Sequence, residues 1–97
     1  MDRAAAEKLQ LLALSTMARL SESLEFVEDN GTPEEAARHR RAVATLLGAF
    51  CSEVLLPIHA EHPDLLPEGL RGPYKIDPAA YGPPFYTRPD KRSGGAG

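Results

Sequence analysis

The stretch that decides the fold is Glu28-Asp29-Asn30-Gly31-Thr32-Pro33-Glu34-Glu35. Asn30 and Gly31 are the residue types that end a helix in the left-handed conformation. Thr32 has the features of a helix N-cap, with Pro33 at the first helical position and Glu35 placed for a capping box. A helix end and a helix start are therefore nearly contiguous. So short a connection, within the roughly two to eight residues usual between packed helices, makes the two helices antiparallel neighbours.

Helical periodicity extends on both sides of this turn. No Pro or Gly occurs from Ala4 to Val27, and the apolar residues recur there at steps of three and four. The first stripe is Leu9, Ala13, Met17, Leu20, Leu24 and Val27. The second stripe is Ala36, Val43, Leu47, Phe50, Val54 and Ile58. The sequence therefore predicts an all-α fold, with an antiparallel two-helix hairpin in residues 1–62.

Pro57 limits the second helix. Proline has no N–H to bond back to Glu53, and its ring crowds the preceding turn, which costs about 3 kcal/mol in a regular helix. We expect the helix to end or kink near Leu55 or Leu56.

The composition changes after the second helix. From Pro57 to Gly97 the chain holds eight of its nine prolines and six of its eight glycines, which excludes a long helix or a central strand. Residues 63–97 are expected to form an irregular Pro/Gly-rich tail. Within it, Asp77–Gly82 predicts a single helical turn, residues 82–89 an extended polyproline-like segment, and Ser93–Gly97 a flexible end.

Composition and charge narrow the function. A chain of 97 residues allows one small domain near the lower size limit for a self-sufficient core, which favours association with another chain. The 11 basic and 14 acidic residues leave a net charge of −3, so nucleic acid is an unlikely partner and attachment to a membrane surface has no support. The single cysteine fits a reducing compartment. No basic leader and no run of about 20 apolar residues is evident, and a cytoplasmic protein is expected.

Charge is distributed unevenly along the two predicted helices. Leu9–Ala18 and Ala42–Ser52 contain no charged residue. In an antiparallel pair centred on this turn, residue i of the first helix lies level with roughly residue 61 − i of the second. The two uncharged stretches then lie side by side and form an apolar belt about 15 Å tall.

Apolar residues lie on every side of the helices within this belt, whereas a hairpin can bury only one face of each helix. The hairpin is therefore expected to complete a four-helix bundle, by forming a homodimer or by docking on a protein partner. Small residues in the second helix would let a further helix approach closely. The tail could cover the belt of its own chain, wrap around a neighbour, or do both. The predicted interface residues are Leu11, Leu14, Ala18, Ala37, Ala44, Gly48, Leu55, Tyr81, Phe85 and Tyr86.

Three other motifs have weaker functional interpretations. His59 and His62 are candidate metal ligands, because imidazoles three residues apart share a helix face, but neighbouring prolines and the lack of a Glu-x-x-His motif favour surface or capping roles. Cys51 lies on the apolar stripe and is expected to be a buried small hydrophobe rather than a nucleophile. The acidic turn region, from Glu22 to Glu35, is interpreted as a solvated tip or as a docking site for a basic surface.

The sequence contains no glycine-rich phosphate loop and no nucleophile motif. We therefore predict a non-enzymatic interaction or assembly protein without a cofactor. The alternative is a small bundle that binds a ligand or metal near His59 and His62.

Overall fold

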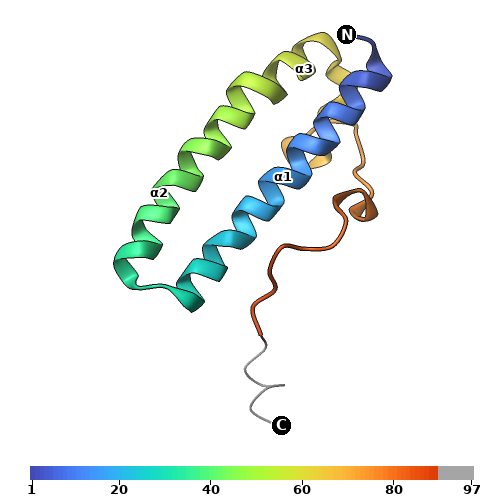
Figure 1. Ribbon diagram of the computed structural model, residues 1–97. Coiled ribbons are helices and arrows are strands. Elements are labelled where there is room, and N and C mark those ends of the chain that lie inside the picture. The colour runs from blue at the N-terminus through green and yellow to red at the C-terminus, as the bar shows by residue number, and fades with distance from the viewer. Residues whose placement is uncertain (90–97) are drawn as a thin grey trace.

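The computed structural model describes residues 1–89, and this part of the chain contains seven helical segments. They are α1 (Arg3–Asn30), α2 (Pro33–Ala49), the π-helical η1 (Phe50–Leu55), α3 (Leu56–Glu61) and the short 3-10 turns η2 (Pro63–Leu65), η3 (Glu68–Leu70) and η4 (Pro78–Tyr81). No strand occurs in this range, so the all-α prediction is confirmed. Figure 1 shows α1 and α2 side by side in opposite directions, with the N-terminus beside α3.

The turn between α1 and α2 contains the predicted capping box. The hydroxyl of Thr32 accepts a hydrogen bond from the amide of Glu35 at 3.1 Å, and the carboxylate of Glu35 accepts one from the amide of Thr32 at 2.8 Å. The expected left-handed helix end is wrong, because Gly31 is extended with a φ of −120°. A Cβ on Gly31 would lie 3.0 Å from both the carbonyl oxygen of Val27 and the carboxylate of Glu35. Close backbone approach is therefore the reason for glycine here.

Pro57 led us to expect an end or a kink near Leu55 or Leu56. The helix does not end there, but its α-helical pattern is interrupted by the π-helical η1. Helical structure continues to Glu61, and the amide of Leu56 bonds to the carbonyl of Cys51, five residues back. This wider π-helical turn places Pro57 in the first turn of α3, where its missing N–H needs no helical acceptor. The π-segment thus accommodates a proline that a regular α-helix would not.

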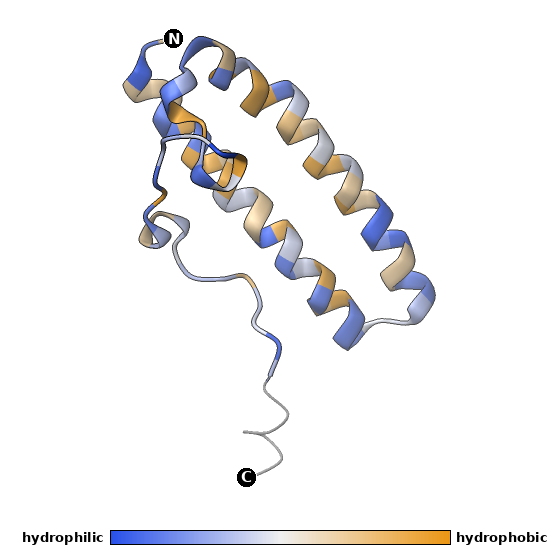
Figure 2. Ribbon diagram, turned by 180° about the vertical axis from the view of Figure 1, so that it is seen from behind, coloured by the Kyte–Doolittle hydropathy of each residue, from blue (hydrophilic) through white to orange (hydrophobic). Residues whose placement is uncertain are grey.

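The core lies at the open end of the helix pair. Ala6 of α1, Ile58 of α3 and Leu65 of η2 form its buried cluster, with the half-buried Tyr74 packed against it. Figure 2 shows the segment after α3 folded back against the helices on this side of the molecule. The first part of the tail therefore belongs to the core.

Hydrogen bonds close a loop between Leu66 and Tyr74. The amide of Tyr74 donates to the carbonyl of Leu66 at 3.0 Å, and the amide of Gly72 donates to the carbonyl of Pro67 at 2.9 Å. A Cβ on Gly72 would lie 2.0 Å from the carbonyl oxygen of Leu66. This position therefore has no room for a side chain.

The rest of the described tail runs along α1. Asp77 caps η4 by accepting a hydrogen bond from the amide of Ala79 at 2.9 Å, so the single helical turn predicted for Asp77–Gly82 is confirmed. Residues 82–89 are non-helical and continue toward the turn between α1 and α2 (Figure 1). The flexible end predicted for Ser93–Gly97 lies outside the described residues.

The Leu66–Tyr74 loop yields a stability prediction. The substitution Gly72→Ala is expected to lower the free energy of unfolding by about 1 to 3 kcal/mol, because the new methyl group must displace backbone atoms. Chemical denaturation followed by circular dichroism measures this. Gly69→Ala is the matched control, since a Cβ there meets no atom within 4 Å. Equal stabilities for the two variants would contradict this account of the loop.

Candidate functional site

An apolar groove lies between α1 and α2. Its volume is about 350 Å³, and both helices and the tail contribute to its walls. The lining residues are Thr16, Arg19, Leu20 and Ser23 of α1, His39 of α2 and Phe85 of the tail. Because Thr16 and Ser23 share the groove with His39, the helix stripes that contain them face the same side of the molecule.

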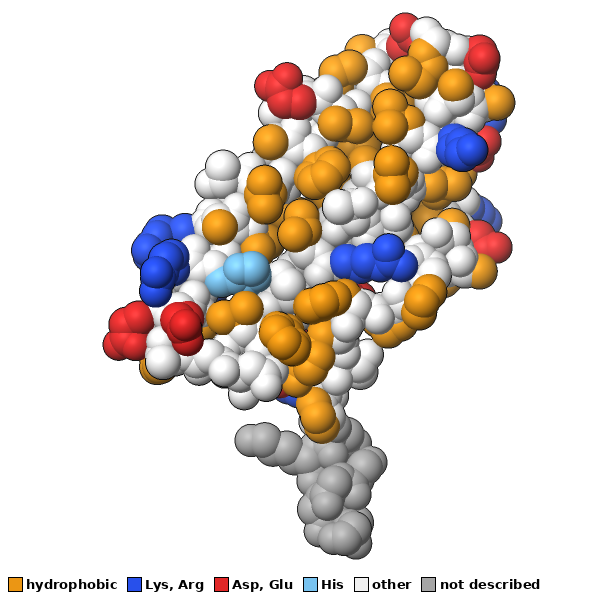
Figure 3. Space-filling view, viewed as in Figure 1, with side chains coloured by type: hydrophobic (Ala, Val, Ile, Leu, Met, Phe, Trp, Pro, Cys, Tyr) orange, Lys and Arg blue, Asp and Glu red, His pale blue; other side chains and the backbone are white. Residues whose placement is uncertain are grey.

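Helical spacing extends this side beyond the groove. Leu12 lies one turn before Thr16 on α1, while Ala42 and Leu46 lie three and seven residues after His39 on α2. Phe50 is four residues further on. We call this surface the front face, made of Leu9, Leu12, Thr16, Arg19, Leu20, Ser23, His39, Ala42, Leu46 and Phe50. Figure 3 shows hydrophobic side chains gathered over both helices on the side turned to the viewer.

The front face leaves large aliphatic side chains in solvent. Leu12 is 62% exposed and Leu46 is 47% exposed. Among the described residues, the large aliphatic side chains that are buried are Val43, Leu55, Ile58 and Leu65. Burial of a leucine stabilises a fold by about 1.5 to 3 kcal/mol. The exposure of two leucines therefore forgoes a substantial part of the stabilisation open to a chain with so small a core.

A polar pair sets the register of α1 against α2. The hydroxyl of Ser23 donates to the carbonyl of Leu20 and lies 2.8 Å from Nε2 of His39. Because a serine hydroxyl carries one hydrogen, Nε2–H of His39 donates to Ser23. This pair lies within one residue of the register expected from the sequence.

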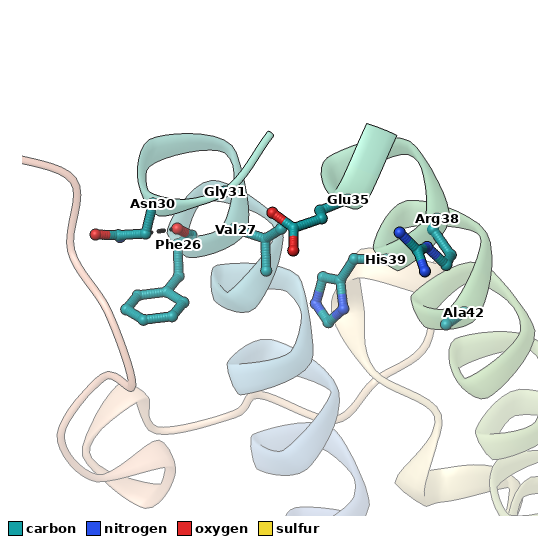
Figure 4. Close-up of a pocket in the computed structure, with 8 residues that line it drawn as sticks. All are labelled: Phe26, Val27, Asn30, Gly31, Glu35, Arg38, His39 and Ala42. Carbon is teal, nitrogen blue, oxygen red and sulfur yellow. Dashed lines mark hydrogen bonds between the residues drawn. The ribbon is translucent and has the colours of Figure 1, made fainter. Parts of the chain in front are cut away.

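A second hollow, of about 480 Å³, lies at the turn end of the helix pair. Figure 4 shows Val27 and Phe26 of α1 on one side and Arg38 and His39 of α2 on the other. The guanidinium of Arg38 has no partner among the described residues, whereas Glu35 is engaged in the capping box. The hollow therefore provides a basic edge to the front face near the turn.

The predicted interface residues of α1 lie on another side of the helix. Leu11, Leu14 and Ala18 are half-buried. Leu11 and Ala18 share a helical stripe with Glu22, whose carboxylate accepts hydrogen bonds from backbone amides of the tail. The tail therefore runs along this side of α1 in its own chain, and the sequence analysis did not select Leu12, the most exposed leucine of the belt.

Tail aromatics and an arginine attach the tail to the acidic turn region. The ring of Phe26 lies 5.5 Å from the ring of Phe85 and 5.2 Å from that of Tyr86, edge to face in both cases. The Tyr86 hydroxyl donates to Asp29 at 2.7 Å, and Arg88 forms an ion pair with Glu28 at 2.8 Å. We call these contacts the clasp.

The clasp neutralises part of the acidic turn region. Arg88 also pairs with Asp29 at 3.0 Å, and Arg40 of α2 pairs with Glu28 at 3.4 Å. The hydrogen bond from Arg88 is the main reason why the pKa of Glu28 is lowered. The turn region is therefore occupied, in part, by this chain's own tail. The tail is also bound further along α1, where Arg19 donates to the carbonyl of Tyr81 at 3.3 Å.

The predicted interface residues of α2 divide into two groups. Ala44 and Gly48 are exposed and Ala37 is half-buried, so the row of small residues remains largely open. Leu55, in contrast, is only 4% exposed and is buried within the chain, which corrects its assignment to an interface.

The π-helical segment explains two departures from the expected stripe. A five-residue hydrogen-bonded turn inserts an extra residue into the helix, so positions inside and after η1 no longer follow the α-helical stripe. Leu55 is turned inward in this segment. Cys51 is exposed rather than buried, contrary to the sequence-based expectation.

A buried amide joins three segments of the chain. Gln10 of α1 is 0% exposed, and its amide group donates to the carbonyl of Leu65 at 2.9 Å. Its oxygen lies 2.6 Å from Nε2 of His59, which therefore donates. Burial lowers the pKa of His59 from its ordinary value of 6.5. The sequence analysis did not single out Gln10, although a glutamine within an uncharged apolar stretch was a usable signal.

The two candidate metal ligands have different partners. His59 bonds to Gln10, whereas Nε2 of His62 lies 3.0 Å from the carbonyl oxygen of Met1 and 3.1 Å from the carboxylate of Glu61. No group of three or more His, Cys, Asp or Glu side chains suited to a metal ion occurs among residues 1–89.

One helical stretch, Pro33–Glu61, is long and apolar enough to cross a membrane by length and composition. Its apolar window is 22% buried inside the chain. The stretch contains Ala42–Ser52, the part of the apolar belt that the second helix contributes. Buried helices of soluble proteins have the same composition, so this property alone does not identify a membrane segment.

The lowered pKa of His59 predicts a pH dependence of stability. Above the unfolded pKa of about 6.5, His59 is neutral in both states and its contribution is constant. As the pH falls from 7 to 5, the unfolded state binds the proton first, and the free energy of unfolding is expected to decrease. Denaturation at a series of pH values measures this slope.

The matched variant for this prediction is His59→Gln, since glutamine can still donate to Gln10 but does not titrate. We expect a flatter profile between pH 7 and 5. The lowered pKa values of Glu61 and Asp64, which ordinarily titrate near 4.5 and 3.8, affect stability mainly at lower pH. An unchanged slope in His59→Gln would assign the effect to another group.

The clasp predicts a local change that depends on salt. Arg88→Ala is expected to speed hydrogen exchange severalfold at the amides of Phe85 and Tyr86, because both ion pairs that hold this segment are lost. Raising the salt concentration should act in the same direction on the wild type. Arg41→Ala is the control, since Arg41 is exposed and has no ion pair within residues 1–89. Equal exchange rates in both variants would contradict the role of Arg88.

Comparison with known proteins finds no match among protein-family models, curated proteins or solved structures. The function is therefore inferred from the front face, the clasp and the buried amide.

Proposed function

We propose that this chain is a non-enzymatic interaction or assembly protein that docks through its front face. In this proposal the α1–α2 hairpin is half of a four-helix bundle, and another helical surface covers Leu12 and Leu46. The observation that carries the proposal is the exposure of these two leucines, at 62% and 47%, on a face without charge from Leu9 to Ala18 and from Ala42 to Ser52.

The size of the chain supports an association role. A domain of this length is near the lower limit for a stable core, and three of its seven buried aliphatic residues in the described range are alanines. Association would bury the exposed leucines and add to a small core. Unlike the scattered apolar residues of most surfaces, those of the front face are contiguous along two neighbouring helices.

A protein partner suits the front face better than lipid does. The Pro33–Glu61 helix is tied to α1 by the Ser23–His39 pair and by the Gln10–His59 hydrogen bond, and α1 carries charged residues at both ends of the belt. Glu53 would also lie within the apolar window, where a carboxylate is costly in hydrocarbon. Docking on protein leaves these charges at the rim of the interface.

The tail contributes by covering the outer side of α1 in the same chain. Its ion pairs to Glu28 and Asp29 and its aromatic contacts with Phe26 occupy that side. The tail reaches the front face at Arg19 and, through Phe85, at the edge of the groove, and it leaves Leu12 exposed to a partner. The proposal locates the protein in the cytoplasm.

Photocrosslinking in the host cell tests this function. A photoreactive phenylalanine analogue, p-benzoylphenylalanine, replaces Leu46 in one variant and Thr45 in the other. Thr45 is exposed and about 100° further round the helix, so it serves as the control. We expect a crosslinked protein adduct from position 46 and little or none from position 45.

The test depends on whether position 46 forms a protein adduct and does not depend on which protein is crosslinked. No adduct at position 46, or equal adducts at 45 and 46, would overturn docking through the front face. Circular dichroism of each variant shows whether the helices are intact, and retained helix content is expected because both positions are exposed.

A further inference from the structure

We propose that the tail segment 83–89 occupies, in its own chain, a site that recognises a similar segment of a partner protein. The site, which we call the clasp site, is formed by Glu22, Phe26, Glu28 and Asp29 of α1. The partner segment is extended and proline-flanked, and it carries two adjacent aromatic residues followed, two positions on, by an arginine. This surface is separate from the front face, so the inference does not depend on the function proposed above.

The main chain of the bound segment is held without regard to its side chains. The carboxylate of Glu22 accepts hydrogen bonds from the backbone amides of Phe85 and Tyr86. Any extended segment with a free amide at these two positions can form the same bonds. Prolines precede and follow the two aromatic residues, and they favour an extended chain that loses little entropy on binding.

Aromatic contacts make the site selective for the two residues that follow the prolines. The ring of Phe26 meets those of Phe85 and Tyr86 edge to face, at 5.5 and 5.2 Å. Such pairs stabilise a contact beyond the area that they bury. The hydroxyl of Tyr86 also donates to Asp29 at 2.7 Å, so the second position favours tyrosine.

Two carboxylates make the site selective for arginine at the next contact. Nη2 of Arg88 lies 2.8 Å from Glu28 and 3.0 Å from Asp29, and its Nε donates to Asp29 at 3.1 Å. A guanidinium presents several N–H groups in one plane and can bind two carboxylates together, whereas a lysine ammonium has no such fork. The spacing from Tyr86 to Arg88 is therefore part of what the site recognises.

The tail is an occupant that can be displaced. Phe85 is 55% exposed and Phe26 is 39% exposed while they are in contact. Ion pairs between exposed side chains contribute little to stability, and segments held in this way open locally. Tyr74 and Leu65, which attach the first part of the tail, lie at the opposite end of α1. The clasp can therefore open while the core stays intact.

The acidic charge around the clasp site exceeds what the tail supplies in return. Residues 20–37 contain six acidic residues and no basic one. Arg88 and Arg40 form ion pairs there, but Glu25 and Glu34 have neither a hydrogen bond nor an ion pair within residues 1–89. A partner segment with further basic residues is attracted by this remaining charge. That attraction lets it compete with a tethered tail, whose effective concentration is on the order of millimolar.

Fluorescence anisotropy with a labelled synthetic peptide tests the site on the full chain. The peptide has the sequence of residues 83–89, and a peptide of the same composition in scrambled order is its control. Arg88→Ala weakens the internal competitor, so this variant is expected to bind the peptide roughly fivefold or more tightly than the wild type does. Arg41→Ala, which removes the same charge from an exposed arginine without an ion pair, should bind as the wild type does.

Two further variants in the Arg88→Ala background locate the peptide. Asp29→Asn should weaken binding roughly threefold or more, because the carboxylate binds both the tyrosine hydroxyl and the guanidinium. Leu46→Ser, on the front face, should leave the affinity unchanged. Both side chains are exposed, and circular dichroism is expected to show unchanged helix content. A peptide with Thr87→Lys adds one positive charge and should bind more tightly than the original.

Four results would overturn this inference. They are the absence of peptide binding to Arg88→Ala at millimolar concentration, equal affinities of Arg88→Ala and the wild type, equal binding of the scrambled peptide, and a loss of binding in Leu46→Ser in place of Asp29→Asn. None of them bears on the front face, which photocrosslinking at position 46 tests independently.

Discussion

The buried amide of Gln10 is the interaction on which the open end of the structure depends. One side chain, fully removed from solvent, binds His59 of α3 and the backbone of Leu65. Each hydrogen bond is modest in net free energy, but an unpaired buried group costs about 1 to 3 kcal/mol, so the three partners must stay together. The segment after α3 is thereby held against α1, and Leu65 can complete the cluster with Ala6 and Ile58.

This arrangement uses the tail as a third structural layer in place of a third helix. The first part of the tail fills the core at the open end, and the clasp attaches its later part to the acidic turn region. The first part lies on the opposite side of the helix pair, whereas the later part reaches the edge of the front face at Phe85 and at Arg19. The apolar surplus of the two helices is consequently concentrated on one side, which is the physical basis for proposing a four-helix assembly. The acidic turn, interpreted from the sequence as a possible docking site, instead binds Arg88 of its own chain.

Several local features followed from the sequence because they depend on neighbouring residues. The capping box of Thr32 and Glu35 and the single turn after Asp77 are of this kind. The sequence-based expectations failed at Gly31, Cys51 and Leu55, where geometry beyond the nearest neighbours decides. Pro57 was expected to end or kink the helix, and the structure accommodates it with a π-helical turn that precedes it.

What the sequence by itself determined is the all-α class, the position of the turn and the uncharged belt, because periodicity, capping and charge are properties of short stretches. Only the tertiary structure decided which side of the belt is covered. The tail lies on the side of α1 that carries Leu11 and Ala18, and Leu12 remains exposed on the front face. The reason is that the path of a Pro/Gly-rich tail is selected by long-range contacts, here with Gln10, Glu22 and Asp29, whose partners lie more than 50 residues away.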